Sequence, residues 1–189
     1  MMAKNIPKMP LPKLDDLFTT EEERTNDKLE KVIDIKISDI DDFPDHPFKV
    51  IENEDMFNMR DSIKENGVLV PALVRQKPDG RYEMVSGHRR KYASQLANNE
   101  TLPCIVRDLT DDEAVIIMVD SNLQREEILP SEKAFAYKMR MEALNHKGTK
   151  GTDSTEKITN ETGEKRRQIF RYIRLTYLIK DFLDAVDSI

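Results

Sequence analysis

Hydrophobic residues follow regular spacings along most of the chain, but not in its first thirty residues. That stretch contains three prolines, dispersed lysines and then acids, which is typical of a flexible arm. Beyond it, short apolar runs indicate strands, and the turn sequence Pro78-Asp79-Gly80 should join two of them as a hairpin. The predicted strands are 32–37, 68–75, 81–85 and 104–107.

Helices are predicted where apolar residues recur every three or four positions after a capping residue. Asn53 is a suitable N-cap for a helix that ends at Gly67. Thr110 and Glu113 form a capping box for a helix that runs through about Asp120. Two more helices are predicted over 88–97 and from Pro130 onward, the second with an apolar stripe at Ala134, Tyr137, Met141 and Leu144.

The last part of the chain predicts a helix-turn-helix unit. After a polar hinge at 146–153, Ser154 or Thr155 can cap a short helix that contains Ile158 and Thr162. Gly163 supplies the turn, and a second helix over 165–177 should pack Ile169 and Ile173 against the first. Thr159 stands where such units usually have alanine, so the two helices should cross with slight crowding.

The leading end of that second helix is basic and is a candidate DNA-reading surface. Lysine and arginine can contact phosphates, whereas arginine and glutamine can form paired hydrogen bonds to base edges. Taken alone, the segment is interpreted equally well as the solvated basic face of an ordinary helix. The candidate DNA-binding residues are Lys165, Arg166, Arg167, Gln168 and Arg171.

Composition narrows the functions that remain. A net charge of −6 argues against a protein coated in positive charge, so any nucleic-acid surface must be local. The single cysteine, Cys104, excludes an intramolecular disulfide, and its apolar neighbours predict a buried thiol. No apolar run is long enough for a signal peptide or a membrane span, which predicts a cytoplasmic protein. His46 and His146 lack metal-ligand spacing, so structural or solvent roles are favoured for both.

Two segments at helix junctions have the chemistry of a phosphate site. Ser86-Gly87-His88-Arg89-Arg90 joins a strand to a helix, where backbone N–H groups, the helix dipole and two guanidiniums can hold an anion. In Ser121-Asn122-Leu123-Gln124-Arg125-Glu126, which follows another helix, Asn122 suits a hydrated magnesium ion and Arg125 suits a phosphate. Taken singly, each segment is also explained as an ordinary turn.

The order of these motifs resembles that of ParB-type partition proteins from about Val32 to the end of the chain. The resemblance rests on GVLVPALVR at 67–75, GHRRKYA at 87–93 and NLQRE at 122–126, followed by the predicted helix-turn-helix. It implies an α+β fold in three parts. These are a flexible arm at 1–30, a small ParB/sulfiredoxin-like α/β nucleotide-binding domain at 31–126, and an all-α DNA-binding domain at 127–189 that lacks the family's C-terminal dimerisation domain.

The resemblance also implies a DNA clamp gated by CTP. In the family, the first segment lines a cytosine pocket, largely through backbone contacts, and the other two hold the triphosphate and its Mg²⁺. The implied partners are double-stranded DNA with a centromere-like site, a ParA-type ATPase that contacts the arm, and a second copy of the chain in a nucleotide-dependent homodimer. The implied nucleotide-binding residues are Gly67, Val68, Pro71, Gly87, His88, Arg89, Arg90, Ser121, Asn122, Gln124 and Arg125, with Asn122 facing the metal.

The chain departs from the family pattern at two positions. His88 and Ser121 stand where the GERR-like and ENxQR-like motifs have glutamates. Because a carboxylate can orient metal or water, we expect nucleotide binding with slow, altered or absent hydrolysis.

Two other functions are alternatives. A transcriptional regulator or nucleoid-associated protein could use the same scaffold at an operator. A small phosphotransferase resembling sulfiredoxin is disfavoured, because Gly87-His88-Arg89 lacks the cysteine of that enzyme's Gly-Cys-His-Arg string and Cys104 lies elsewhere.

Overall fold

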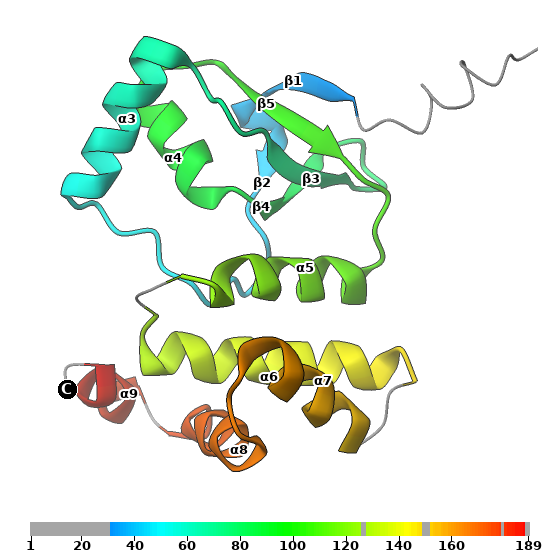
Figure 1. The fold of residues 1–189 in the computed structure, drawn as a ribbon. Coiled ribbons are helices and arrows are strands. Elements are labelled where there is room, and N and C mark those ends of the chain that lie inside the picture. Colours follow the sequence, from blue (N-terminus) through cyan, green and yellow to red (C-terminus); the bar gives the residue numbers. More distant parts are fainter. Residues whose placement is uncertain (1–30, 126–127, 149–151, 179, 188–189) are drawn as a thin grey trace, which may run out of the picture. The chain divides into compact units, whose positions relative to one another are not determined.

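The computed structural model describes residues 31–125, 128–148, 152–178 and 180–187, and its helices and strands belong to one compact unit, 32–189. The predicted arm and residues 149–151 of the predicted hinge lie outside the described residues. The elements, in chain order, are β1 (Val32–Lys36), η1 (Ile37–Asp39), β2 (Ile40–Asp41), α3 (Glu54–Asn66), β3 (Ala72–Gln76), β4 (Tyr82–Ser86), α4 (His88–Leu96), β5 (Thr101–Val106), α5 (Asp111–Leu123), α6 (Pro130–His146), α7 (Thr152–Thr162), α8 (Arg166–Leu175) and α9 (Lys180–Asp187) (Figure 1).

Five strands form one mixed sheet in the order β1-β5-β3-β4-β2. The predicted hairpin is confirmed, because β3 and β4 pair antiparallel around a turn in which Gly80 has φ +84°. β3 also pairs parallel with β5, and β1 pairs antiparallel with the other edge of β5. Val74, Met84 and Leu102 are fully buried in the sheet core, together with Cys104, as predicted.

Helices α3 and α4 pack side by side next to the sheet (Figure 1). The predicted caps of α3 are confirmed: the amide of Met56 donates to Oδ1 of Asn53 at 3.0 Å, and Gly67 ends the helix at φ +71°. Met56 and Ile63 of α3 pack against Ala93 of α4, which fixes the direction in which α4 leaves the sheet.

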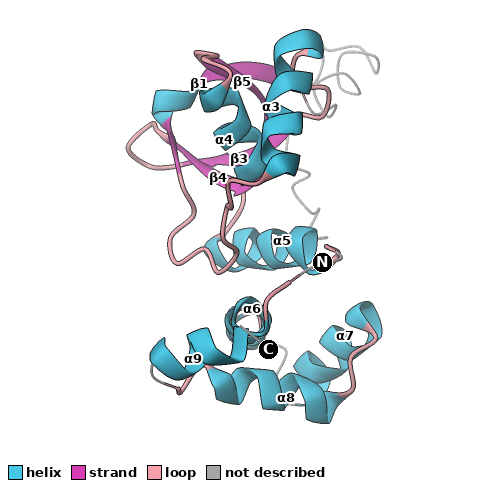
Figure 2. Cartoon of the chain, turned by 90° about the vertical axis from the view of Figure 1, so that its left-hand side faces the viewer, coloured by secondary structure: helices cyan, strands magenta, loops and turns pink. Residues whose placement is uncertain are grey.

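Helix α5 lies between the sheet and α6 (Figures 1 and 2). It starts at the predicted capping box, in which Thr110 and Glu113 bond reciprocally. Met118 and Val119 of α5 pack against β4 and the loop that precedes α3. On the other side, the buried guanidinium of Arg140 from α6 pairs with Asp120 of α5 at 2.9 Å and with Glu161 of α7.

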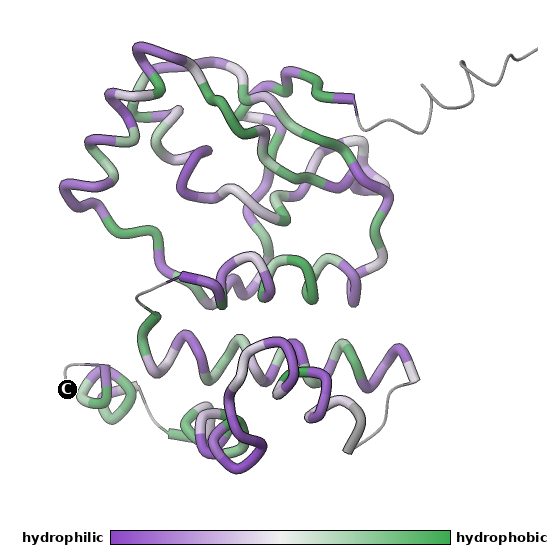
Figure 3. Tube along the Cα trace, in the orientation of Figure 1, coloured by the Kyte–Doolittle hydropathy of each residue, from purple (hydrophilic) through white to green (hydrophobic). Residues whose placement is uncertain are grey.

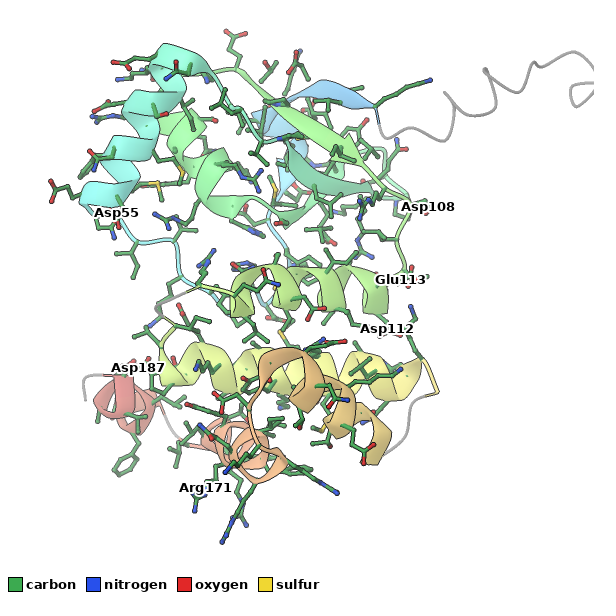
Figure 4. All side chains as sticks on the ribbon, in the orientation of Figure 1. Asp55, Asp108, Asp112, Glu113, Arg171 and Asp187 are labelled. Atoms are coloured by element: carbon green, nitrogen blue, oxygen red, sulfur yellow. The ribbon has the colours of Figure 1, made fainter. Side chains whose placement is uncertain are left out.

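The last three helices gather around α6 (Figure 2). Ile158 of α7 and Ile169 of α8 are fully buried with α6 side chains, and Ile173 packs at the edge of this cluster, as predicted. Gly163, at φ +73°, lies between α7 and α8. At the start of α6, the backbone amide and hydroxyl of Ser131 donate to the carboxylate of Asp187 in α9 at 2.9 and 2.5 Å (Figure 4).

The fold class is confirmed, since a small sheet with helices is followed by helices only, whereas several predicted boundaries are wrong. Residues 68–71 precede β3 rather than belonging to it. Pro71 has no N–H to donate to a neighbouring strand, and two carbonyls of this loop accept hydrogen bonds from Arg90 instead. Strand β5 begins three residues before the predicted start, at Thr101, where it pairs with β1.

The helix ends also differ from the prediction. Ser154 and Thr155 do not cap α7, because they lie buried inside it, where Oγ of Ser154 donates to Oδ1 of Asn145 at 2.8 Å. Ser121 and Asn122 belong to the last turn of α5 instead of following the helix. No helix among the described residues is long and apolar enough to cross a membrane.

Candidate functional site

Gly87 is the N-cap residue of α4 and has a conformation that only glycine adopts easily, with φ +116°. A Cβ at this position would lie 2.9 Å from Cβ of Ala72 in β3 and 3.3 Å from Nη2 of Arg90. The junction between β4 and α4 is therefore pressed against β3. The first-turn amides of α4 have no acceptor within the helix, and they give its N-terminus a positive end.

Arg89, Gln124 and Arg125 line one cavity of about 1140 Å³. Arg89 comes from the first turn of α4, whereas Gln124 and Arg125 follow the last turn of α5, so two distant segments meet there. Lys49, from the loop before α3, adds a third cation to the lining, and Asp55 and Glu132 add two carboxylates. The label in Figure 4 places Asp55 at the start of α3.

The two guanidiniums of the cavity are held near each other without an ion-pair partner among the described residues. Burial, followed by the nearby charge of Arg89, lowers the pKa of Arg125. The Arg125 guanidinium lies over the Phe48 ring, 5.6 Å from its centroid. Glu132 is already engaged, because its carboxylate accepts from the backbone amides of Lys49 at 2.8 Å and Leu129 at 3.3 Å. An anion would relieve the repulsion between the two arginines.

Arg90 is oriented differently from Arg89. Its Nη1 donates to the carbonyls of Val70 at 2.7 Å and Pro71 at 2.6 Å, and it does not line the cavity. Pro71 of the predicted pocket segment thus accepts from Arg90, and Gly67, Val68 and Pro71 lie outside the cavity lining.

The predicted metal residue, Asn122, is 5% exposed, and its amide nitrogen donates to the carbonyl of Met118 at 2.7 Å. Ser121 is exposed, and its hydroxyl donates to the same carbonyl at 3.0 Å. Among the residues with described positions, no group of three or more His, Cys, Asp or Glu could hold a metal ion. The nitrogen of the Asn122 side chain is used inside α5, which leaves its side-chain oxygen as the atom that could face a metal ion.

The His88 ring packs against the His46 ring, with the ring centroids 3.8 Å apart and the ring planes tilted by 39°. Nδ1 of His46 lies 2.8 Å from the carbonyl of Phe48, which fixes that nitrogen as the donor, and Nε2 of both rings is buried without a partner in the described part of the chain. Burial lowers the pKa of His46, and burial together with the neighbouring His46 lowers the pKa of His88 to about 3. Lys91 and Arg125 also disfavour the charged form of His88, and Asp42 opposes them.

Sequence reasoning missed the residues that the loop before α3 contributes. Phe48 lies under Arg125, Lys49 lines the same cavity, and His46 packs on His88, yet none of the three belongs to a recognisable motif. The conformation of this loop depends on residues distant in sequence, such as Glu132, which accepts a 2.8 Å hydrogen bond from the backbone amide of Lys49. The local sequence of the loop therefore contained no signal of its role in the site.

The basic end of α8 is fully presented to solvent. Lys165 is the N-cap residue of α8, and none of the five candidate DNA-binding residues forms an ion pair within the described ranges. Figure 4 shows Arg171 on the side of α8 turned away from α6, and the leading end of the helix is hydrophilic in Figure 3. Arg174, which the sequence reasoning omitted, is exposed in the last turn of the same helix.

The sulfiredoxin-like alternative receives no support from Cys104. The thiol is fully buried, and burial raises its pKa to about 11, which keeps it protonated and unreactive.

Comparison with known proteins gives a family and close relatives. Residues 21–123 match the family described as the ParB N-terminal domain. The chain is 35% identical to the chromosome-partitioning protein Spo0J of Thermus thermophilus over 82% of this chain and 55% of that protein, and 29% identical to a nucleoid occlusion protein of a Geobacillus species over 95% of this chain and 62% of that protein. It spans about half the length of the partition proteins it matches.

Solved structures also match much of the chain, and one of them is a partition protein bound to DNA. A C-terminally truncated ParB of Caulobacter crescentus, complexed to the centromeric parS site, has 30% identity and a TM-score of 0.55, over 82% of this chain and 78% of that one.

The packed pair of His46 and His88 predicts acid sensitivity. Because the folded state holds the pKa of His88 at about 3, below its ordinary 6.5, the unfolded chain binds a proton more readily between these values, and stability falls as the pH drops below about 6.5. From His88 alone, lowering the pH to 4.5 should cost about 2–3 kcal/mol of unfolding free energy. Urea unfolding of the parent and of His88→Gln at pH 8 and pH 4.5 measures this cost. At pH 8, the difference in unfolding free energy between the two proteins gives the packing cost of the substitution. The prediction would be contradicted if both proteins lost the same unfolding free energy between pH 8 and pH 4.5.

Proposed function

The chain belongs to the ParB N-terminal domain family, and on that premise we propose that it is a DNA-partition protein that binds CTP and a centromere-like DNA site. The observation that supports the nucleotide part is the cavity lined by Arg89 and Arg125, neither of which has an ion-pair partner among the described residues. Two half-buried guanidiniums and a helix N-terminus are suited to a polyphosphate.

In this proposal, Arg89, Arg125 and Lys49 hold the triphosphate, and Gln124 adds an amide at the rim. The loop 67–71 supplies backbone groups to the base, as the family resemblance implies. Mg²⁺ is a counterion of the phosphates to which Asn122 offers at most one oxygen, since its amide nitrogen is bound within α5.

The DNA part of the proposal assigns α7 and α8 to a helix-turn-helix unit with α8 as the recognition helix. The five residues predicted from the sequence are all exposed, and Arg174 extends the basic row. The Caulobacter relative, bound to parS, supports this assignment. Two chains would have to act together to read a site with two halves.

The clamp itself is also a proposal. Nucleotide binding would let two chains engage across DNA, and the arm at 1–30, which lies outside the described residues, would contact a ParA-type ATPase. A cytoplasmic, nucleoid-associated location stays a prediction.

The match to a nucleoid occlusion protein favours a second candidate, a nucleoid-associated DNA-binding protein. Mapping of the protein on the chromosome separates the two functions. Broad spreading around a few centromere-like sites supports partition, whereas many scattered sites support nucleoid association.

The first test is calorimetric titration with CTP, ATP, GTP and UTP. The parent chain should prefer CTP, and Arg125→Ala should weaken CTP binding about tenfold to a hundredfold, because one charge-assisted contact is lost. Arg60→Ala is the matched control, since Arg60 pairs with Asp61 away from the cavity. Equal affinity for all four nucleotides, or equal losses in both variants, would refute the nucleotide proposal.

A second test concerns hydrolysis. With imidazole and hydroxyl in place of two carboxylates at His88 and Ser121, phosphate release from CTP should be slow even with DNA present. The double variant His88→Glu, Ser121→Glu should raise it about tenfold or more, since a positioned carboxylate contributes to proton transfer. Rapid, DNA-stimulated release by the parent chain would show that these positions do not limit hydrolysis.

A third test concerns DNA, with fluorescence anisotropy on a parS duplex and a random duplex. Arg171→Ala should weaken binding to both and reduce the slope of log affinity against log salt by about 0.9, the contribution of one phosphate contact. Gln168→Ala should instead reduce the preference for parS. Lys36→Ala removes one exposed charge from β1 and should change neither quantity. If it weakened binding as much as Arg171→Ala, α8 would not be the interface.

A further inference from the structure

Arg89 and Arg90 are neighbours in sequence, but their side chains serve different places. Successive residues of an α-helix point about 100° apart, so two adjacent arginines in the first turn of α4 cannot both face one cavity equally. Arg89 lines the cavity with Arg125, whereas Nη1 of Arg90 binds the carbonyls of Val70 and Pro71.

The loop 67–71 depends on few other contacts. It precedes β3, and Pro71 has no N–H to donate to a neighbouring strand. Leu69 and Val70 are 79% and 63% exposed, so their side chains do not anchor the loop, and only Val68 packs against the core.

The surroundings of Arg90 also differ from those of a phosphate ligand. Burial lowers the pKa of Arg90, and within the described residues no carboxylate pairs with it. Its guanidinium lies beside Gly87, where a Cβ would be 3.3 Å from Nη2, so the close contact between β3 and the start of α4 leaves it little freedom to swing away.

We propose that Arg90 is a positioning residue that holds the loop 67–71 against α4 and thereby sets nucleobase selectivity, while Arg89 and Arg125 bind the phosphates. The inference rests on the proposed nucleotide function, because the loop is the base pocket only in that proposal. It assigns the two arginines of one motif to opposite ends of the ligand.

A phosphate series separates the two roles. Affinities for CMP, CDP and CTP are measured for the parent chain, Arg89→Ala and Arg90→Ala, with UTP as the base control. Arg89→Ala should lose most affinity for CTP and least for CMP. Arg90→Ala should lose the same factor, about tenfold to a hundredfold, for all three cytidine nucleotides, and its preference for CTP over UTP should shrink. A loss in Arg90→Ala that grows with each phosphate would overturn the inference.

Hydrogen exchange of the nucleotide-free protein gives an independent measurement. Amides of 68–70 and 72 should exchange faster in Arg90→Ala than in the parent or in Arg89→Ala, while amides of α6 stay unchanged and exclude global unfolding. Arg90→Lys, whose ammonium can bind one carbonyl, should restore part of the protection and keeps the test usable if Arg90→Ala folds poorly. Unchanged loop exchange in both Arg90 variants would overturn the inference. Absence of nucleotide binding by the parent chain would instead overturn the proposed function, and the exchange result would still decide whether Arg90 holds the loop.

Discussion

The repulsion between Arg89 and Arg125 is the constraint on which the cavity depends. Neither guanidinium has a carboxylate partner in the described part of the chain, and burial lowers the pKa of Arg125 further. Two like charges repel each other, so other interactions must hold the backbone segments that bring them together. Here those interactions are hydrophobic: α4 is fixed through Ala93 against α3, and α5 through Met118 and Val119 against the sheet.

Local features of the fold could be predicted from the sequence because they depend on neighbouring residues. Asn53 caps α3 and the Thr110 and Glu113 pair caps α5, since each capping bond joins residues three positions apart. Ser154 and Thr155 have the same chemistry but are buried inside α7, because packing against α6 decided the start of that helix. The helix-capping tendency of a residue indicates where a helix can begin, and tertiary contacts determine at which of these positions it does begin.

The site was less predictable than the fold. Arg89 and Arg125 were identified by motif and are brought into one cavity, but the motif gave no sign that Arg90 points to a loop instead. Phe48 reaches Arg125, and Lys49 the cavity wall, from a loop whose shape is set by contacts some eighty residues distant in sequence, such as that with Glu132. His46 was assigned a structural role, which fits its place against His88, although the pairing itself could not be inferred.

The bond between α9 and α6 has a mechanical consequence. Asp187 holds the first turn of α6 through Ser131, and residues 129, 130 and 132 of that same turn form a wall of the cavity. A force that pulls on α9 is therefore transmitted to that wall through the first turn of α6 alone. By thermodynamic reciprocity, any ligand that stiffens the wall must tighten the docking of α9 to the same extent that docking of α9 favours the ligand.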